Sequence, residues 1–444
     1  MTSRLPSVPS RRSTDVNPAL RPTTPTPATP AQPGTRPATG TPTDFTAGNA
    51  TGVQTRLSTI RSLLSGHTDR KEETALLALF KNANAGELNQ LINGLSRQEL
   101  HEVTSDMNDR LFGPDNKTAF LSLLTKERVG DLTVESRAKL VQALQINSTD
   151  GKEEKAIGAL FLATKGEGLS ALKNAIDGGS DHRDLQQLIF HDIDDGALRT
   201  QLLAHFKTEA TPKDGKVKVL SDIDDTFYAN WKDDRFPKKT IYPGVRALYA
   251  ELDRGGGATA DRTGDLMFLS ARPYDRPGVS EHFSREMMHD HGVTQATVLS
   301  GDFAHLIGNH SIADKKFENW QQVNQLYPEY GSVFLGDSGQ GDAIFGAKAA
   351  AANADMRSVF IHNVTHMDAA GKAAEAQKGV FVFDTYVGAA TEAFKRGLIS
   401  KGGLERVMNE AHREFAALTF SSPEQKSERK AELDRDTAAA RSLL

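Results

Sequence analysis

Four short apolar runs in the second half of the chain constrain its fold more than any other feature. They lie at residues 217–220, 266–269, 333–335 and 358–361. Helical patterns follow them or lie between them, at residues 245–252, 278–291, 316–326 and 343–353. Strands that alternate with helices favour a parallel sheet with helices on both faces. Because such sheets bind ligands at the carboxyl ends of their strands, we expect an α/β fold with a functional site at that edge.

Three carboxylates and a hydroxyl group follow the first apolar run, in the segment Ser-Asp222-Ile-Asp224-Asp225-Thr226. Like charges at one strand end are costly unless a cation or a reacting proton compensates them, and a hard divalent ion with oxygen ligands fits. Asp222 is placed to attack phosphorus as a nucleophile, and Asp224 to act as general acid and base. We expect Thr226 to fix the turn or to bind a phosphate oxygen, and Asp225 to be structural. The alternative interpretation is an acidic turn that caps a helix.

Two further motifs offer groups that bind phosphate. Ser270 and Arg272 end the second apolar run, where a hydroxyl group and a planar guanidinium can both donate to phosphate oxygens. Lys316 lies in Asp-Lys-Lys at the expected start of a helix, where its charge could neutralise a carboxylate nucleophile and a transferring phosphoryl group. Taken singly, the Ser270 and Arg272 motif is better explained as a strand followed by an ordinary proline turn, and an ordinary helix start is a strong alternative for Lys316.

The fourth motif is Gly336-Asp337-Ser-Gly-Gln-Gly-Asp342, which follows the third apolar run. Glycines there let the backbone approach a ligand closely, and both acids are candidate magnesium ligands. The alternative is a glycine-rich turn between a strand and a helix. The four motifs occur in order within one α/β region, which makes an independent coincidence improbable.

The remainder of the chain has a different character. Residues 1–52 are rich in Pro and Thr and predict a disordered segment. Residues 53–209 predict an all-α region of two repeats, at about 53–128 and 134–208, in which Thr68 and Thr149 each mark a helix start. Residues 215–400 hold the α/β domain, and residues 401–444 predict a charged helical tail.

The four motifs together resemble those of the haloacid dehalogenase superfamily. Residues 216–400 are more narrowly similar to the phosphatidate phosphatase catalytic-domain family typified by the fungal actin-patch-associated enzyme. The resemblance implies a Rossmannoid three-layer sandwich. It also implies that Asp222 is the nucleophile, Asp224 the acid and base, and Lys316 the phosphate-stabilising lysine. Magnesium is implied at the side chains of Asp222, Asp337 and Asp342 and at the carbonyl group of Asp224.

The chain departs from the family pattern in two places. It has Ser300-Gly301-Asp302 where an Arg-Asp pair is expected, and the stretch 228–239 adds Trp231, Asp233 and Asp234. The spacings between Thr226, Ser270 and Lys316 leave little room for a cap domain. An open site suits a lipid headgroup or a phosphoprotein better than a small metabolite that needs enclosure.

These features predict a magnesium-dependent phosphatase that acts on phosphatidate or a related lipid phosphate at a membrane surface, through peripheral contact. One alternative is a phosphoprotein or small-molecule phosphatase of the same fold. Another is a binding or effector protein that acts through its helical repeats, which are candidate sites for a protein partner.

Composition narrows the function further. The net charge is −5, so nucleic acid is not an expected partner, and the lack of cysteine excludes thiol catalysis and disulfides. No apolar run approaches the length that spans a bilayer. We expect a cytoplasmic or peripheral membrane protein, with non-classical secretion as the alternative.

Overall fold

The computed structural model describes residues 47–444 apart from residues 67, 106, 108–114, 148, 178–183, 212–216, 257–265, 274–296, 302–307 and 353–354. The side chains of residues 47–51, 270–273 and 297–301 also lie outside the described part. The expected disordered segment, up to residue 46, and the expected helix at 278–291 therefore fall outside it. Residues 48–444 form one compact unit. None of the described helices is both long and apolar enough to cross a membrane.

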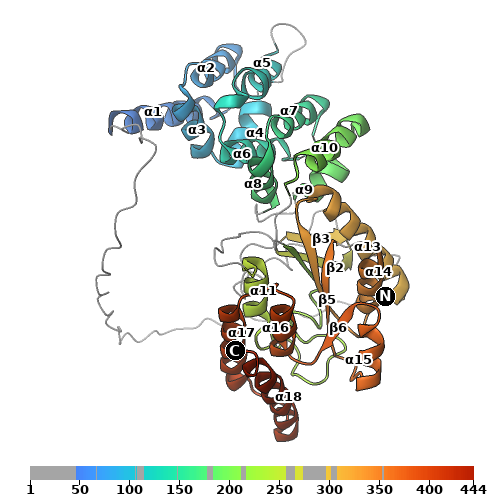
Figure 1. The fold of residues 1–444 in the computed structure, drawn as a ribbon. Coiled ribbons are helices and arrows are strands. Elements are labelled where there is room, and N and C mark those ends of the chain that lie inside the picture. Colours follow the sequence, from blue (N-terminus) through green and yellow to red (C-terminus); the bar gives the residue numbers. More distant parts are fainter. Residues whose placement is uncertain are drawn as a thin grey trace, which may run out of the picture. The chain divides into compact units, whose positions relative to one another are not determined.

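The first half of this unit is all-helical (Figure 1). Its helices up to residue 127 are α1 (Ala47–Leu63), α2 (Arg70–Lys81), α3 (Ala85–Gly94), α4 (Arg97–Ser105) and α5 (Asn116–Ser122), which runs into a π-helical turn at Leu123–Glu127. Then, after a 3₁₀ turn at Val129–Asp131, come α6 (Val134–Leu144), α7 (Gly151–Leu162), α8 (Gly166–Asp177), α9 (Leu185–Gln187) with a π-helical turn at Leu188–Asp192, and α10 (Gly196–Glu209).

Corresponding helices of the two repeats begin in the same way. Asp69 caps α2 and Asp150 caps α7, and in each case a glutamate three residues later closes a capping box. The prediction that Thr68 and Thr149 mark these helix starts was wrong by one residue. The aspartate side chains accept the free N–H groups of the first turn, and their negative charge favours that end of the helix.

Six parallel strands form the described sheet of the second half, in the order β3-β2-β1-β4-β5-β6. They are β1 (Val217–Ser221), β2 (Leu266–Pro273), β3 (Thr297–Gly301), β4 (Gly331–Asp337), β5 (Met356–His362) and β6 (Val380–Phe383). The four apolar runs all lie within strands, as predicted. The two edge strands, β3 and β6, were not predicted. Every residue of β1 and β4 is buried, as expected for central strands covered on both faces.

Helices cover both faces of the sheet, which confirms the predicted three-layer α/β sandwich. Alternate residues of β4 point to opposite faces, so that Val333 and Leu335 share one core and Phe334 belongs to the other. The first core is completed by α11 (Val245–Arg254), α16 (Tyr386–Lys395), α17 (Lys401–Ala417) and α18 (Pro423–Arg441). The second is completed by α13 (Asn309–Leu326) and α14 (Asp342–Ala352). The remaining helix, α15 (Ala369–Ala376), contacts β6.

Two sequence expectations change in the structure. Residues 401–444 do form charged helices, but Leu404, Val407 and Ala411 of α17 are buried in the same core as α11 and α16. The helix expected to open at Lys316 begins at Asn309, so Lys316 lies two turns inside α13. Lys316 is therefore held by a formed helix and does not belong to a frayed end.

Candidate active site

The carboxyl ends of the two central strands bring the first and fourth motifs together. Asp222 directly follows β1, and Asp337 is the last residue of β4. The strands are parallel and paired with Ser221 opposite Leu335, and the N–H of Asp222 donates to the carbonyl oxygen of Leu335 at 2.9 Å. The sheet itself thus positions both aspartates at one edge.

Lys316 reaches this edge from α13. Its Nζ lies 2.7 Å from Asp222 Oδ1 and 2.5 Å from Asp342 Oδ1, and all three side chains are buried. Asp342 begins α14, and its other carboxylate oxygen accepts the N–H of Asp337 at 3.2 Å. The third motif is therefore joined to the first and the fourth by a single ammonium group.

Three carboxylates lie together here, and Lys316 contacts two of them, Asp222 and Asp342. Asp222, Asp337 and Asp342 each offer an oxygen, and the three oxygens lie within 4.8 Å of one another. Burial raises the pKa of Asp222 to about 7, against the opposing charge of Lys316. Burial, together with the charges of Asp342 and Asp222, raises the pKa of Asp337 well above its usual range. Three carboxylates and one ammonium leave a net charge of −2 when all are ionised, and a buried excess of this kind calls for a cation.

Two atoms of this cluster have no partner. The Oδ2 atoms of Asp222 and Asp337 are buried without a hydrogen bond, whereas buried polar atoms are normally paired. Oxygen donors only, three carboxylates and two orphaned oxygens are the ligand set of a hard divalent cation such as Mg²⁺. The residues present therefore fit the metal that the sequence predicts. For Lys316, burial lowers the pKa, but the charges of Asp222 and Asp342 outweigh it and raise the pKa overall.

Glycines of the fourth motif allow this close packing. A Cβ atom at Gly336 would lie 2.5 Å from Asp342 Oδ2, and one at Gly341 would lie 2.3 Å from the carbonyl oxygen of Asn309. A side chain at Gly336 would displace the carboxylate of Asp342 from β4. A side chain at Gly341 would force α14 away from α13. The sequence predicted that these glycines let the backbone approach a ligand; the contacts shown here are close packing within the protein, and the approach of a ligand remains a prediction.

Asp224 lies beside the cluster and has different partners. Its Oδ1 accepts hydrogen bonds from the hydroxyl group of Tyr228 at 2.9 Å and from Asn230 Nδ2 at 2.7 Å, and its side chain is partly exposed. The side chain is not a member of the carboxylate trio, and its predicted metal contact is through the backbone carbonyl group. A partly exposed carboxylate held by two neutral donors is suited to exchange a proton with a bound substrate.

The remaining predicted phosphate ligands are placed less completely. Thr226 is fully buried, its Oγ1 has no hydrogen-bond partner, and its carbonyl oxygen accepts the hydroxyl group of Tyr386. Ser270 and Arg272 lie on β2, which pairs with β1, but their side chains lie outside the described residues. Their phosphate contacts remain predictions.

Asp225 organises the loop that follows the first motif. It is fully buried with a φ of 60°, and its carboxylate accepts the N–H groups of Asn230, Trp231 and Lys232. These bonds hold the loop over the strand end and set Asn230 against Asp224. The interpretation of Asp225 as a structural residue agrees with this arrangement.

A buried polar cluster that the sequence did not reveal anchors the other side of the same loop. Arg235 pairs with Asp233 through two bonds of 2.9 Å and also contacts His362 Nε2 at 2.8 Å, and Tyr242 donates to Asp233 at 2.7 Å. His362 ends β5, and its Nδ1 lies 3.1 Å from the carbonyl oxygen of Asp225. Arg235 and His362 are 127 positions apart, so no local pattern could have paired them.

Burial and neighbouring charges set the protonation states of His362 and Asp233 in this buried polar cluster. Burial, and then the charge of Arg235, lower the pKa of His362 to about 3, so that its ring is neutral near pH 7. Burial alone would raise the pKa of Asp233, but the bonds and charge of Arg235 outweigh it and lower that pKa to about 2. The added Asp233 of this chain is thus part of a structural ion pair.

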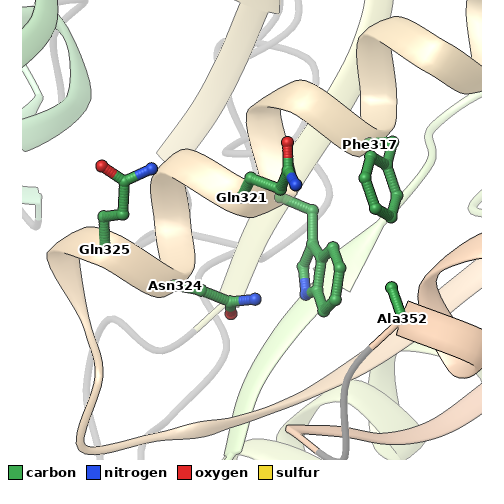
Figure 2. A pocket seen from close by; sticks show the side chains of 6 residues that line it. Phe317, Gln321, Asn324, Gln325 and Ala352 are labelled. Atoms are coloured by element: carbon green, nitrogen blue, oxygen red, sulfur yellow. The ribbon is translucent and has the colours of Figure 1, made fainter.

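A recess elsewhere in the α/β half does not compete with this site. It is lined by Phe317, Trp320, Gln321, Asn324 and Gln325 of α13 and by Ala352 at the end of α14 (Figure 2). None of these lining side chains titrates or can act as a nucleophile. The recess therefore lacks the groups that general acid–base or covalent catalysis requires.

A comparison with known protein families matches the region of the chain that contains this site. Residues 217–363 match the family model described as Phosphatidate phosphatase APP1, catalytic domain. The match runs from the start of β1 to just past β5, so that it contains all four motifs, and it confirms the resemblance drawn from them. No curated protein and no solved structure matches the chain significantly.

Proposed function

We propose that the protein, whose residues 217–363 match the family model of the phosphatidate phosphatase APP1 catalytic domain, is a magnesium-dependent phosphatase that hydrolyses phosphatidate through an aspartyl-phosphate. The observation that carries the proposal is the cluster of Asp222, Asp337 and Asp342 around Lys316 at the strand ends. It supplies a nucleophile, an anion-stabilising lysine and a cation site in one buried place.

Asp222 has the position of the nucleophile. Lys316 holds its Oδ1, whereas its Oδ2 has no protein partner. In the first step, a carboxylate oxygen of Asp222 attacks phosphorus and the bond from phosphorus to the ester oxygen breaks. Asp224 gives its proton to that leaving oxygen, which departs as the alcohol group of diacylglycerol.

The second step returns the site to its starting state. Asp224, now ionised, takes a proton from water, and the water oxygen attacks the phosphorus of the aspartyl-phosphate. The bond from phosphorus to the Asp222 oxygen breaks, inorganic phosphate leaves and Asp222 is a free carboxylate again. Tyr228 and Asn230 keep the carboxyl group of Asp224 in one orientation through both steps.

Charge balance explains the need for a cation. Lys316 neutralises one carboxylate of three, so a phosphate group could not approach the remaining negative charge unaided. When bound to the side chains of Asp222, Asp337 and Asp342, Mg²⁺ would neutralise that charge and polarise the phosphoryl group. The lysine would then be free to interact with the transferring oxygens.

The decisive experiment is phosphate release by the wild-type protein and by Asp222→Asn, with magnesium and with a chelator. Three substrates are compared, namely phosphatidate vesicles, a soluble phosphomonoester and a phosphopeptide. We expect magnesium-dependent release from the vesicles and a loss of roughly a thousandfold or more in Asp222→Asn, because the amide cannot form the intermediate. Asp194→Asn is the matched control, since Asp194 is an exposed aspartate of the helical half, outside the carboxylate cluster.

Each other outcome changes the proposal in a defined way. Release from soluble substrates alone would keep the chemistry and overturn the lipid substrate. Wild-type rates in Asp222→Asn would remove Asp222 as the nucleophile. No release from any substrate would favour a binding or effector role for the helical repeats.

A further inference from the structure

One exposed aromatic side chain lies on the loop beside the site. Among the described residues, Trp231 and Leu443 are the only exposed large apolar side chains, and Trp231 is 70% exposed. Its chain neighbours both touch the site. Asn230 donates to Asp224, and the stem of Lys232 packs at Gly339, where a Cβ atom would lie 2.8 Å from Lys232 Cγ and 3.0 Å from Asp337 Oδ1.

The loop that carries Trp231 is rigidly held. The carboxylate of Asp225 accepts the N–H of Trp231 at 3.0 Å, and Lys238 Nζ donates to the carbonyl oxygen of Trp231 at 3.1 Å. The buried pair of Asp233 and Arg235 fixes the chain two residues further on. A side chain presented in this way needs little ordering when it binds, so its exposure is not the result of a loose loop.

The loop that carries Trp231 has a net positive charge. Lys232, Lys238 and Lys239 are exposed, and against them the loop exposes only the carboxylate of Asp234, which leaves a charge of +2 (three minus one). Asp233 and Arg235 are buried and neutralise each other. The loop is therefore basic, although the chain as a whole has a net charge of −5.

We propose that Trp231, together with Lys232, Lys238 and Lys239, docks the active site onto an anionic lipid bilayer. Tryptophan prefers the interface between water and acyl chains, and lysines near a bilayer are attracted to anionic headgroups. The apolar surface of a single exposed indole is far smaller than the roughly 800 Å² that each partner buries in a stable protein–protein interface. A membrane surface is therefore the occupant that fits both the size and the charge of this loop.

This inference rests on the proposed function for its purpose, since a docked loop would hold the site at the depth of a phosphomonoester headgroup. Its test, however, does not depend on turnover. Vesicles of phosphatidylcholine and phosphatidylserine carry negative charge but no phosphomonoester, so that binding to them is measured without a reaction.

The chain has two tryptophans, and Trp320 is buried, with its indole nitrogen bonded to Ser332. Tryptophan fluorescence can therefore report Trp231 directly. We expect vesicles with brominated acyl chains to quench the wild-type fluorescence, more weakly at high salt and more weakly still without phosphatidylserine. Trp231→Ala should remove the quenching and weaken vesicle co-sedimentation by about tenfold. Trp231→Phe should retain most of the binding.

Activity provides the second measurement. Trp231→Ala and the double variant Lys238→Gln with Lys239→Gln should slow phosphate release from vesicles but not from a soluble phosphomonoester. Asp222→Asn should still be quenched although it turns over nothing, so a failed phosphatase proposal is distinguishable from a failed docking proposal. Absent quenching in the wild type would overturn the inference. An equal loss on soluble substrate in Trp231→Ala would also overturn it, because Trp231 would then act within the site or the fold.

Discussion

The three carboxylates of the site are buried, and Lys316 opposes only part of their charge. Asp337 differs from the other two in that Lys316 does not reach it. Its Oδ1 accepts a hydrogen bond from the N–H of Gly339 at 2.6 Å, and its Oδ2 has no hydrogen bond. Under the proposed function, it is thus the member of the trio that we expect to depend most on a bound cation.

Removing that charge should weaken metal binding. In Asp337→Asn we expect the magnesium concentration for half-maximal activity to rise about tenfold or more, since one anionic ligand is lost. Isothermal titration calorimetry with Mg²⁺ measures the same change without substrate. Asp314→Asn, an exposed acid on α13, is the control. Identical titrations for wild type and Asp337→Asn would contradict a ligand role.

His362 makes stability depend on pH. Its pKa is about 3 in the folded protein, against an ordinary value near 6.5, so below pH 6.5 the unfolded chain binds a proton that the folded chain does not. Its contribution is complete above pH 6.5 and is lost as the pH falls towards 3. The free energy of unfolding should fall by about 2–3 kcal/mol more between pH 6 and pH 4 in wild type than in His362→Gln.

Urea unfolding at each pH measures this difference. The carboxylates of the site have opposite pH effects, but they are common to both proteins and cancel in the comparison. The exposed His310 provides the control, and His310→Gln should keep the wild-type slope. Parallel curves for wild type and His362→Gln would show that the histidine is not held neutral.

At the scale of elements, the C-terminal helices belong to the catalytic fold. Glu414 of α17 accepts the N–H of Gly244 at 2.7 Å and pairs with Arg246, at the start of α11. Arg406 of α17 forms two bonds of 2.7 Å with Glu251 of α11. These polar contacts surround the apolar face that α17 buries, so a stretch that is charged overall still completes a core.

Leu404 tests this packing. It is fully buried in α17, and Leu404→Ala should lower the free energy of unfolding by about 2–5 kcal/mol through lost burial and the cavity that remains. Denaturant unfolding measures the loss, and phosphate release should fall with the folded fraction. Glu405→Ala, at the adjacent exposed position, should change stability by less than about 0.5 kcal/mol. An equal effect of both variants would place α17 outside the core.

At the scale of the whole molecule, buried polar groups join the helical half to the α/β half. Lys173 of α8 bonds Glu329 at 2.9 Å and the carbonyl oxygen of Leu326 at 2.7 Å, and Ser170 donates to Glu329 at 2.7 Å. Lys173 and Glu329 are both almost completely buried. The helices therefore share a specific interface with the segment between α13 and β4.

Breaking this pair should destabilise the molecule. Lys173→Met leaves the charge of Glu329 buried without its cation, and we expect a loss of about 3–5 kcal/mol in the free energy of unfolding. Adding Glu329→Gln should recover part of it. Lys165→Met, at an exposed position before α8, is the control and should be nearly neutral. No loss in Lys173→Met would mean that the two halves do not depend on this contact.

The sequence alone predicted four of the six strands of the described sheet, the helices on both of its faces and the residues that form the carboxylate cluster. It could do so because period, apolar runs and strand-end acids are local properties, and parallel strands bring their carboxyl ends to one edge. The three-dimensional structure was needed to show that Lys316 bridges Asp222 and Asp342, that His362 and Arg235 hold the loop, and that residues 401–444 complete a core. These depend on pairing between residues far apart in the chain, for which burial and close packing provide the energy but no local pattern provides a signal.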